Sequence, residues 1–185
     1  MKRGSFVVFD VETTGLSLRH SEIIQFFALK YSDYKVVREL EVYIRQDKPL
    51  LPKIVEITGI TDQKLEQDGI SPQEAWERIK EFCDWQTVFI GHNMFSFDWP
   101  LLQIFCERYA PQGEKFAGVY ADKLLDTMKI GKYLTPGKKS WPKLSKLCEM
   151  LDIEFNEEEA HNARYDVTKT GECVIQLVKR RMVAV

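Results

Sequence analysis

Two acidic residues stand two positions apart at the end of an apolar run near the N-terminus, and their spacing points to metal chemistry. If the run is a β-strand, the side chains of Asp10 and Glu12 lie on one face, while those of Phe9 and Val11 point the other way. Two like charges held side by side repel each other, and a divalent cation relieves that repulsion. The alternative is that one acid caps a turn at 13–15 and the other is solvated, and the pair alone leaves both interpretations open.

Three further residues with acid or base side chains fall at the ends of predicted elements. Asp98 stands between a short apolar segment ending at Gly91 and an apolar helical pattern, a place from which a polar side chain can lean into a cleft. Asp166 begins an otherwise apolar helix face, and His161 precedes it by five residues. On one ideal helix the two would lie about 140° apart, so a shared site requires His161 in the loop or first turn. A histidine there can take a proton from water near neutral pH.

The strands that must position these residues are predicted from apolar runs and polar breaks. Residues 22–30 and 35–45 flank a polar break at Ser32-Asp33, which predicts a β-hairpin. Together with the run before Asp10, this places three consecutive strands at the start of the chain. A short buried strand is predicted later, at 87–91.

The helices are predicted from caps and from apolar residues at helical spacing. Ser71 to Glu74 form a capping box with a proline at the first helical position, and the helix is expected to run from about Pro72 to Cys83. Three later helices have core faces marked by Phe97, Leu101, Ile104 and Phe105, by Leu144, Leu147, Cys148 and Leu151, and by Ala163, Val167, Val174 and Val178. This order predicts an α/β fold with a mixed sheet flanked by helices.

Size and composition predict a single domain over residues 1–185. A chain of 185 residues that is 44% hydrophobic can bury one good core. Its 26 basic and 28 acidic residues nearly cancel, so an anionic partner must be held by a local patch or by metal. The four cysteines are far apart at apolar positions, which indicates reduced thiols in a cytoplasmic protein rather than a zinc site or disulfides. No apolar run has the length of a signal peptide core or a membrane span.

One segment does concentrate positive charge. From Thr127 through Cys148 there are six lysines and no acidic residue, with Tyr133 and Trp141 among them. Clustered cations with aromatic rings suit the backbone and bases of a single nucleic-acid strand, and the segment would feed such a strand to the site. The alternative is a solvated loop and helix face around Pro136-Gly137, which is the simpler interpretation of any individual lysine.

Three motifs in order make the chain resemble the DnaQ-like, or DEDDh, family of 3′→5′ exonucleases in the ribonuclease H-like superfamily. Phe-Asp10-Val-Glu12-Thr-Thr-Gly resembles its first motif, Gly-His-Asn followed by Phe-Asp98 its second, and His161-x-Ala-x-x-Asp166 its third. The resemblance extends from Phe6 to about Val178. Three motifs in the right order are much less probable by chance than any one of them.

The resemblance implies a catalytic set of four carboxylates and a histidine. Asp10, Glu12, Asp98 and Asp166 would bind two divalent cations, and carboxylates without thiolates suit Mg²⁺ or Mn²⁺. His161 would act as general base toward water. The expected fold is a ribonuclease H-like mixed sheet with three leading antiparallel strands plus parallel strands. The expected reaction releases nucleoside 5′-monophosphates from a DNA 3′ end, preferably a single-stranded one.

The resemblance also implies contacts with the terminal nucleotide. Thr13 and Thr14 would use backbone or hydroxyl groups, and Leu16 would be either an apolar wedge beside the base or a core residue. The remaining expected contact residues are His92, Asn93 and Phe95. Family members usually have two residues between the His-Asn and Phe-Asp pairs, whereas three intervene here at 94–96, so the approach to Asp98 is expected to bulge.

Other functions remain open at this stage. An exoribonuclease of the same family has the same catalytic residues, because the distinction depends on how the pocket treats the 2′-hydroxyl. A catalytically silent nucleic-acid-binding module is a third possibility, although all five catalytic positions are filled. A polymerase or another repair protein is a possible partner. The chain ends soon after its last predicted helix, which slightly favours a stand-alone nuclease over a proofreading subunit.

Overall fold

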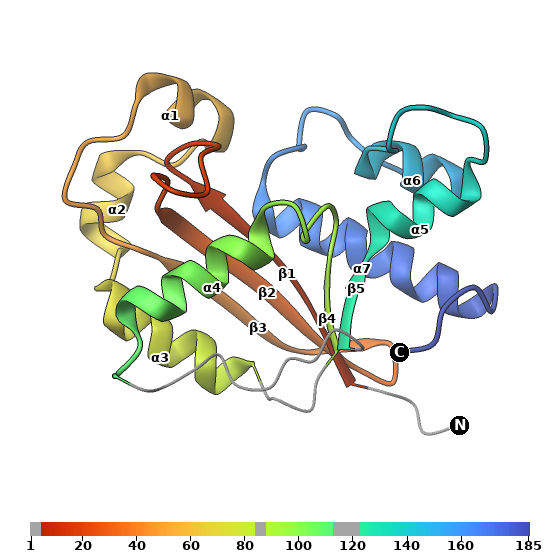
Figure 1. Cartoon of the computed structure of the whole chain (residues 1–185), viewed down its shortest axis with the longest axis horizontal. Coiled ribbons are helices and arrows are strands. Elements are labelled where there is room, and N and C mark those ends of the chain that lie inside the picture. Colours follow the sequence, from red (N-terminus) through yellow and green to blue (C-terminus); the bar gives the residue numbers. More distant parts are fainter. Residues whose placement is uncertain (1–4, 84–87, 113–122) are drawn as a thin grey trace.

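The architecture is a five-stranded mixed sheet with helices on both faces (Figure 1). The computed structural model describes residues 5–83, 88–112 and 123–185. The strand order is β3-β2-β1-β4-β5, where the strands are β1 (Ser5–Thr13), β2 (Ile23–Ser32), β3 (Lys35–Tyr43), β4 (Val88–Gly91) and β5 (Leu124–Asp126). β1, β2 and β3 are antiparallel neighbours, and β4 and β5 run parallel to β1. This confirms the predicted ribonuclease H-like arrangement.

The helices form a layer on each face of the sheet. On one face lie α3 (Pro72–Phe82) and α4 (Asp98–Tyr109), and on the other lies α7 (Ala163–Lys179), which contacts β1 and β2. Beside α7 are α5 (Thr127–Leu134) and α6 (Leu144–Met150), and α1 (Pro52–Thr58) and α2 (Asp62–Asp68) pack at one end of the sheet (Figure 1). No helix in the described ranges combines the length and apolar character that crossing a bilayer requires.

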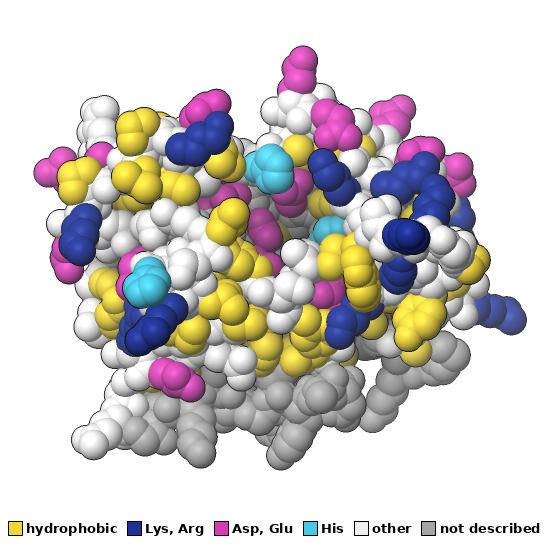
Figure 2. Space-filling view, turned by 45° about the horizontal axis from the view of Figure 1, so that its top comes forward, with side chains coloured by type: hydrophobic (Ala, Val, Ile, Leu, Met, Phe, Trp, Pro, Cys, Tyr) yellow, Lys and Arg dark blue, Asp and Glu magenta, His cyan; other side chains and the backbone are white. Residues whose placement is uncertain are grey.

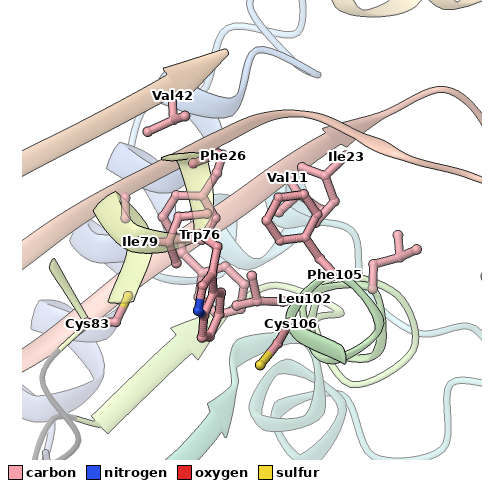
Figure 3. Packing of buried hydrophobic residues seen from close by; sticks show 14 of the residues in the cluster. Val11, Ile23, Phe26, Val42, Trp76, Ile79, Cys83, Leu102, Phe105 and Cys106 are labelled. Carbon is pink, nitrogen blue, oxygen red and sulfur yellow. The ribbon is translucent and has the colours of Figure 1, made fainter. Parts of the chain in front are cut away.

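The alternation of side chains along β1 decides which face receives the acids. Val7, Phe9 and Val11 belong to the core between the sheet and α3 and α4, which Figure 3 shows with Trp76 packed among other buried side chains. Phe6 and Val8 face α7 instead. Asp10 and Glu12 continue the row of Phe6 and Val8, so they point to the α7 side.

A close approach between α7 and β2 fixes the position of that helix. The ring of Tyr31 stacks on Phe6 with centroids 4.7 Å apart. A Cβ atom on Gly171 would lie only 2.1 Å from the Tyr31 hydroxyl oxygen, so only glycine allows this packing. Because α7 carries Asp166, the contact also sets the distance of that acid from β1.

Most predicted elements are confirmed, with small shifts at their ends. The hairpin turn is Asp33-Tyr34, where both residues have positive φ (51° and 62°), as a two-residue turn of the favoured twist requires. The helix from Pro72 ends at Phe82, with Cys83 as its C-cap. Thr87, the predicted start of the fourth strand, lies outside the described residues. All four cysteines are buried free thiols.

Candidate active site

The first two acids lie at the carboxyl end of the central strand. Asp10 and Glu12 are partly buried on the face of β1 that α7 covers. The following turn is closed by the Thr13 hydroxyl, which donates to the Gly15 carbonyl at 2.7 Å, so neither acid is needed as its cap. The shared strand face favours the paired-carboxylate interpretation over a cap and a solvated acid.

Asp98 is brought against β1 by the start of α4. It is the first residue of that helix and is only 6% exposed. Its Oδ1 atom accepts a hydrogen bond from the Val11 N–H at 3.4 Å, so it lies between the positions of the first two acids along the strand. The preceding turn is wide, because the Trp99 N–H donates to the Met94 carbonyl five residues back at 2.9 Å. This turn accommodates the extra residue that the sequence has in its second motif.

Asp166 and His161 lie close together at the start of α7, the helix on the face of the sheet opposite to α4. Asn162 caps the helix, and the His161 N–H outside it donates to Asp166 Oδ2 at 3.1 Å. His161 has a positive φ of 66°, which turns the chain sharply before the helix. The geometric requirement that His161 precede the helix is therefore met. The other oxygen of Asp166, Oδ1, is buried and has no hydrogen-bond partner in the described structure.

Burial raises the pKa of all four carboxyl groups, and repulsion within the group adds to the rise for Asp10 and Glu12. Burial raises the pKa of Asp10 well above 3.8, with further contributions from neighbouring carboxylates. Burial also raises the pKa of Glu12 to about 8, with repulsion from Asp166 and Asp98. The pKa of Asp98 rises to about 7 through burial, against the opposing effect of backbone N–H groups. The pKa of Asp166 is likewise raised by burial. Asp10 and Glu12 are therefore electrostatically linked to Asp98 and Asp166. Attraction to His161 partly offsets the rise in pKa at Asp166.

The loop after β1 exposes an apolar side chain next to this group. The Thr14 N–H donates to the Glu22 carbonyl at 2.9 Å, and the Thr14 hydroxyl accepts from the Glu22 N–H at 3.0 Å. These bonds and the turn at Thr13 hold the loop, whose Leu16 side chain is 90% exposed. The alternative that Leu16 is a core residue is therefore wrong, because its side chain packs against almost nothing.

The second-motif residues before Asp98 are held by the protein itself. The His92 Nδ1 atom lies 3.0 Å from the Thr127 hydroxyl, and Nε2 lies 3.2 Å from the Pro142 carbonyl oxygen. Asn93 has a positive φ of 65°, and the ring of Phe95 is covered by the Lys129 ammonium at 4.1 Å from its centroid. Both ring nitrogens of His92 are thus engaged by the protein itself. Substrate contact by His92, Asn93 and Phe95 stays a prediction.

Comparison with protein families decides where this chain belongs. A family model named RNase_T and described as Exonuclease matches residues 7–173. The chain belongs to the RNase_T exonuclease family. This family is DnaQ-like and lies in the ribonuclease H-like superfamily, so the resemblance seen in the three motifs is confirmed.

The known relatives of this RNase_T exonuclease chain include DNA polymerases. It is 36% identical over 162 residues to the DNA polymerase III PolC-type of Mycoplasma genitalium. The matched region covers 88% of this chain and 10% of the polymerase. It is 32% identical over 181 residues to the PolC-type polymerase of Bacillus subtilis. That match covers 97% of this chain and 12% of the polymerase. The chain thus corresponds to about a tenth of the length of these relatives.

Solved structures of exonuclease I share the fold of the RNase_T exonuclease chain. The E. coli enzyme in complex with a dT13 oligonucleotide has a TM-score of 0.77 at 25% identity and covers 97% of this chain and 42% of that chain. The zinc-ion-bound form of an E. coli exonuclease I complex with single-stranded DNA has a TM-score of 0.76 at 25% identity and covers 97% of this chain and 41% of that chain. These likenesses confirm the mixed α/β fold over nearly the whole chain.

One buried residue of the RNase_T exonuclease site had no predicted role. Asp126 ends β5 and is 3% exposed. Its Oδ1 atom accepts from the N–H groups of Asn93 and Met128, each at 2.9 Å, and its Oδ2 atom accepts from the Phe95 N–H at 3.2 Å. It therefore holds the loop that leads to Asp98. A single acid directly after the apolar Leu124-Leu125 pair is the only signal of this in the sequence.

The chemistry of the carboxylate group fits a divalent cation. Its donors are all oxygen atoms, which Mg²⁺ and Mn²⁺ prefer, and the exonuclease family generally uses divalent metal ions. None of the ion pairs within the described ranges involves these four acids. As they stand, no three His, Cys, Asp or Glu side chains of residues 5–83, 88–112 and 123–185 are grouped to hold an ion. Instead, Asp10 and Asp98 share a hydrogen bond, which a cation would have to replace.

The molecular surface has a central hollow with acidic side chains at its floor (Figure 2). Figure 2 also shows a histidine at its rim and apolar side chains along its edge. A cavity of about 690 Å³ adjoins His161 and lies between α1 and the start of α7, with Gly59 and Tyr165 among its lining residues. Of the proposed catalytic residues, His161 lines this cavity, and the four acids do not.

Proposed function

We propose that this chain hydrolyses phosphodiester bonds at the 3′ end of DNA, with a single-stranded end preferred, and releases nucleoside 5′-monophosphates. The observation that carries the proposal is the buried group of carboxylates contributed by β1, α4 and α7, with His161 held against Asp166. The exonuclease I complex with a dT13 oligonucleotide and the PolC-type relatives support DNA as the substrate.

In this proposal Asp10, Glu12, Asp98 and Asp166 hold two divalent cations, Mg²⁺ or Mn²⁺. When bound, such ions stabilise negative charge on the phosphoryl group and lower the pKa of water. The chain's own residues perform the other tasks. Burial raises the pKa of the four acids, so any protons that they carry would be released when cations bind.

His161 is proposed as the general base that takes the proton from the attacking water. The hydrogen bond from its backbone N–H to Asp166 fixes the chain at this point, and its side chain is exposed at the cavity. A base must reach the proton that it abstracts, and the turn before α7 lets a solvent-facing ring do so.

Substrate contacts are proposed on both sides of the carboxylates. Thr13, Thr14 and Leu16 would hold the terminal nucleotide, with the exposed Leu16 side chain placed beside its base. Asn93 and Phe95, with His92 behind them, would line the other side. All these residues belong to one proposed DEDDh exonuclease domain over residues 1–185, and its proposed location is cytoplasmic.

A polymerase or another repair protein is the proposed partner, since the named relatives are DNA polymerases of which this chain matches a small part. Pull-down of the purified chain with its host's replicative polymerase would test this point directly.

Digestion of 5′-labelled single-stranded DNA tests the activity. Wild-type protein with magnesium should yield a ladder that shortens from the 3′ end, and EDTA or Asp10→Ala should abolish it. Asp68→Ala, which removes an exposed acid paired with Lys64 on α2, is the matched control and should cleave normally. An RNA strand of the same sequence is digested in parallel. Faster cleavage of RNA would make the protein an exoribonuclease, and binding without cleavage of either strand would make it a silent module.

A further inference from the structure

Exposed aromatic side chains and lysines gather beside the proposed active site, on α5 and on the loop that leads to α6. Tyr133 is 86% exposed and Trp141 is 51% exposed, which is unusual for such large rings. We use the name α5 patch for a group of six residues: Lys129, Lys132, Tyr133, Lys138, Lys139 and Trp141. Figure 2 shows dark-blue and yellow side chains together on the right of the hollow, on the same side as α5 and α6 in Figure 1.

The α5 patch carries positive charge that acids do not balance. The segment from Thr127 through Cys148 contains six lysines and no acidic residue, in a chain whose net charge is −2. Among the residues that the structure describes, only Lys146 of these six forms an ion pair, with Glu149 at 2.6 Å. The positive potential of the α5 patch is therefore available to an anion, and counterions held at the patch would be released when the anion binds.

Hydrogen bonds hold the loop against α5, so the residues of the patch have defined relative positions. The Lys132 ammonium donates to the carbonyl groups of Lys138, Lys139 and Ser140, and it lies 5.8 Å from the centroid of the Trp141 ring. On α5, Lys129 and Tyr133 are four residues apart and share one face, since both are exposed. Stacking surface and cations thus alternate along one side of the molecule.

Two contacts join the α5 patch to the loop that carries Asp98. Lys129 covers the ring of Phe95 at 4.1 Å from its centroid. The Pro142 carbonyl, next to Trp141, lies 3.2 Å from the His92 ring. A chain leaving the hollow on this side would pass over the patch without a break.

We propose that the α5 patch binds the single-stranded DNA on the 5′ side of the terminal nucleotide, with Tyr133 and Trp141 stacking on bases and the lysines contacting phosphates. Single-stranded DNA is favoured over duplex because exposed rings can stack only on unpaired bases, and lysines recognise its backbone without regard to sequence. The inference rests on the proposed function, whose site would receive the 3′ end of the same strand.

Binding in EDTA measures the patch separately from cleavage. Fluorescence anisotropy with 5′-labelled oligothymidylates of increasing length should show affinity that rises with length in the wild type. Tyr133→Ser/Trp141→Ser should weaken binding of the longer strands by at least about fivefold, given the usual contribution of base stacking on aromatic rings. Tyr133→Phe/Trp141→Phe keeps an aromatic ring at both positions and should restore most of the affinity. Circular dichroism checks that each variant is folded.

The salt dependence tests the lysines. Lys138→Gln/Lys139→Gln should reduce the slope of log affinity against log salt by about 1.4, at about 0.7 for each phosphate contact on a single strand. Lys35→Gln/Arg38→Gln removes two exposed cations from β3, the edge strand opposite β5 in the sheet, and should leave the slope unchanged. An equal loss of slope in both double variants would overturn the assignment of the patch.

The outcomes separate the two proposals. Patch-dependent binding without any cleavage under magnesium would sustain the patch and reject the exonuclease. Cleavage by the wild type with binding that ignores both patch variants would sustain the exonuclease and reject the patch as a solvated surface. Tighter patch-dependent binding of an RNA strand, or of a duplex, would overturn the assignment to single-stranded DNA.

Discussion

Replacing Glu12 by glutamine tests whether the buried acids are arranged for a cation. Burial raises the pKa of Glu12 from 4.5 to about 8, so in this range the native protein keeps a proton that the unfolded chain has released. Without metal, the contribution of Glu12 to stability is therefore undiminished at low pH and is lost as pH rises toward 8. Glutamine has nearly the same shape and no charge, so the variant should not show this loss.

The pKa rise sets the size of the effect. At about 1.4 kcal/mol for each pH unit, the free energy of unfolding of Glu12→Gln should gain at most about 3.5 kcal/mol on wild type between pH 5 and pH 8. In a domain of this length 1 kcal/mol moves Tm by roughly 2–4 °C, so the gain in Tm is at most roughly 7–14 °C.

Thermal unfolding followed by circular dichroism across this pH range is the assay, first in EDTA and then with magnesium. Magnesium should raise the wild-type Tm at pH 8 far more than that of Glu12→Gln, because a ligand that binds only the native site stabilises it. Glu154→Gln removes an exposed acid and should follow wild type throughout. Parallel loss of stability in wild type and Glu12→Gln, or an equal gain from magnesium, would refute a cation-binding role for Glu12.

Three further substitutions test other parts of the site. Asp126→Ala leaves three N–H groups without the carboxylate that accepts their hydrogen bonds, so the free energy of unfolding in urea should fall by about 2–4 kcal/mol. Asp126→Asn should lower it by less. Equal costs for both would contradict this holding role. Leu16→Ala should change the free energy of unfolding by less than about 0.5 kcal/mol, because the side chain is exposed, yet lower kcat/KM on single-stranded DNA. Unchanged kcat/KM would remove Leu16 from the substrate contacts. His161→Gln should lower kcat by about 10²–10⁴ with little change in KM, and retained kcat would exclude His161 as the base.

The long elements of the fold were predictable because their patterns are long enough to be distinct. β1, β2 and β3 each span nine or ten residues, and α3 begins with a capping box whose Ser71 hydroxyl accepts from the Glu74 N–H at 3.2 Å. Local residue types and the final packing agree in these segments. Such agreement lets the sequence alone define an element.

The short elements escaped prediction for a physical reason. α1 and α2 have seven residues each and β5 has three, and their apolar residues do not recur at the spacing that marked α6, which is equally short. They are held by long-range packing, as when Ile60 and Leu65 pack against Ile24 of β2. The local signals are end signals: a proline begins α1, Gly59 with a positive φ of 70° ends it, and the Thr61 hydroxyl caps α2.

The candidate site could be predicted in its residues and not in their contacts. Strand alternation and three motifs indicated acids on β1, α4 and α7 and a histidine that had to precede its helix, and their catalytic role stays a prediction. The hydrogen bond from Val11 to Asp98 joins residues 87 positions apart, and no local pattern encodes it. The bonds that Asp126 accepts from Asn93 and Phe95 are of the same kind, because they depend on where β5 lies beside β4. Its bond from the first turn of α5, by contrast, is a local helix cap.

Because side chains alternate along β1, a change in the length of this strand would affect the core and the proposed active site together. Phe6 and Val8 pack against α7 from the same row that presents Asp10 and Glu12. Inserting or deleting one residue at the start of the strand would turn some of this row to the other face, so folding and activity would fail together. Natural length variation in this family should therefore fall in loops such as 136–141, and β1 should keep its length wherever the enzyme stays active.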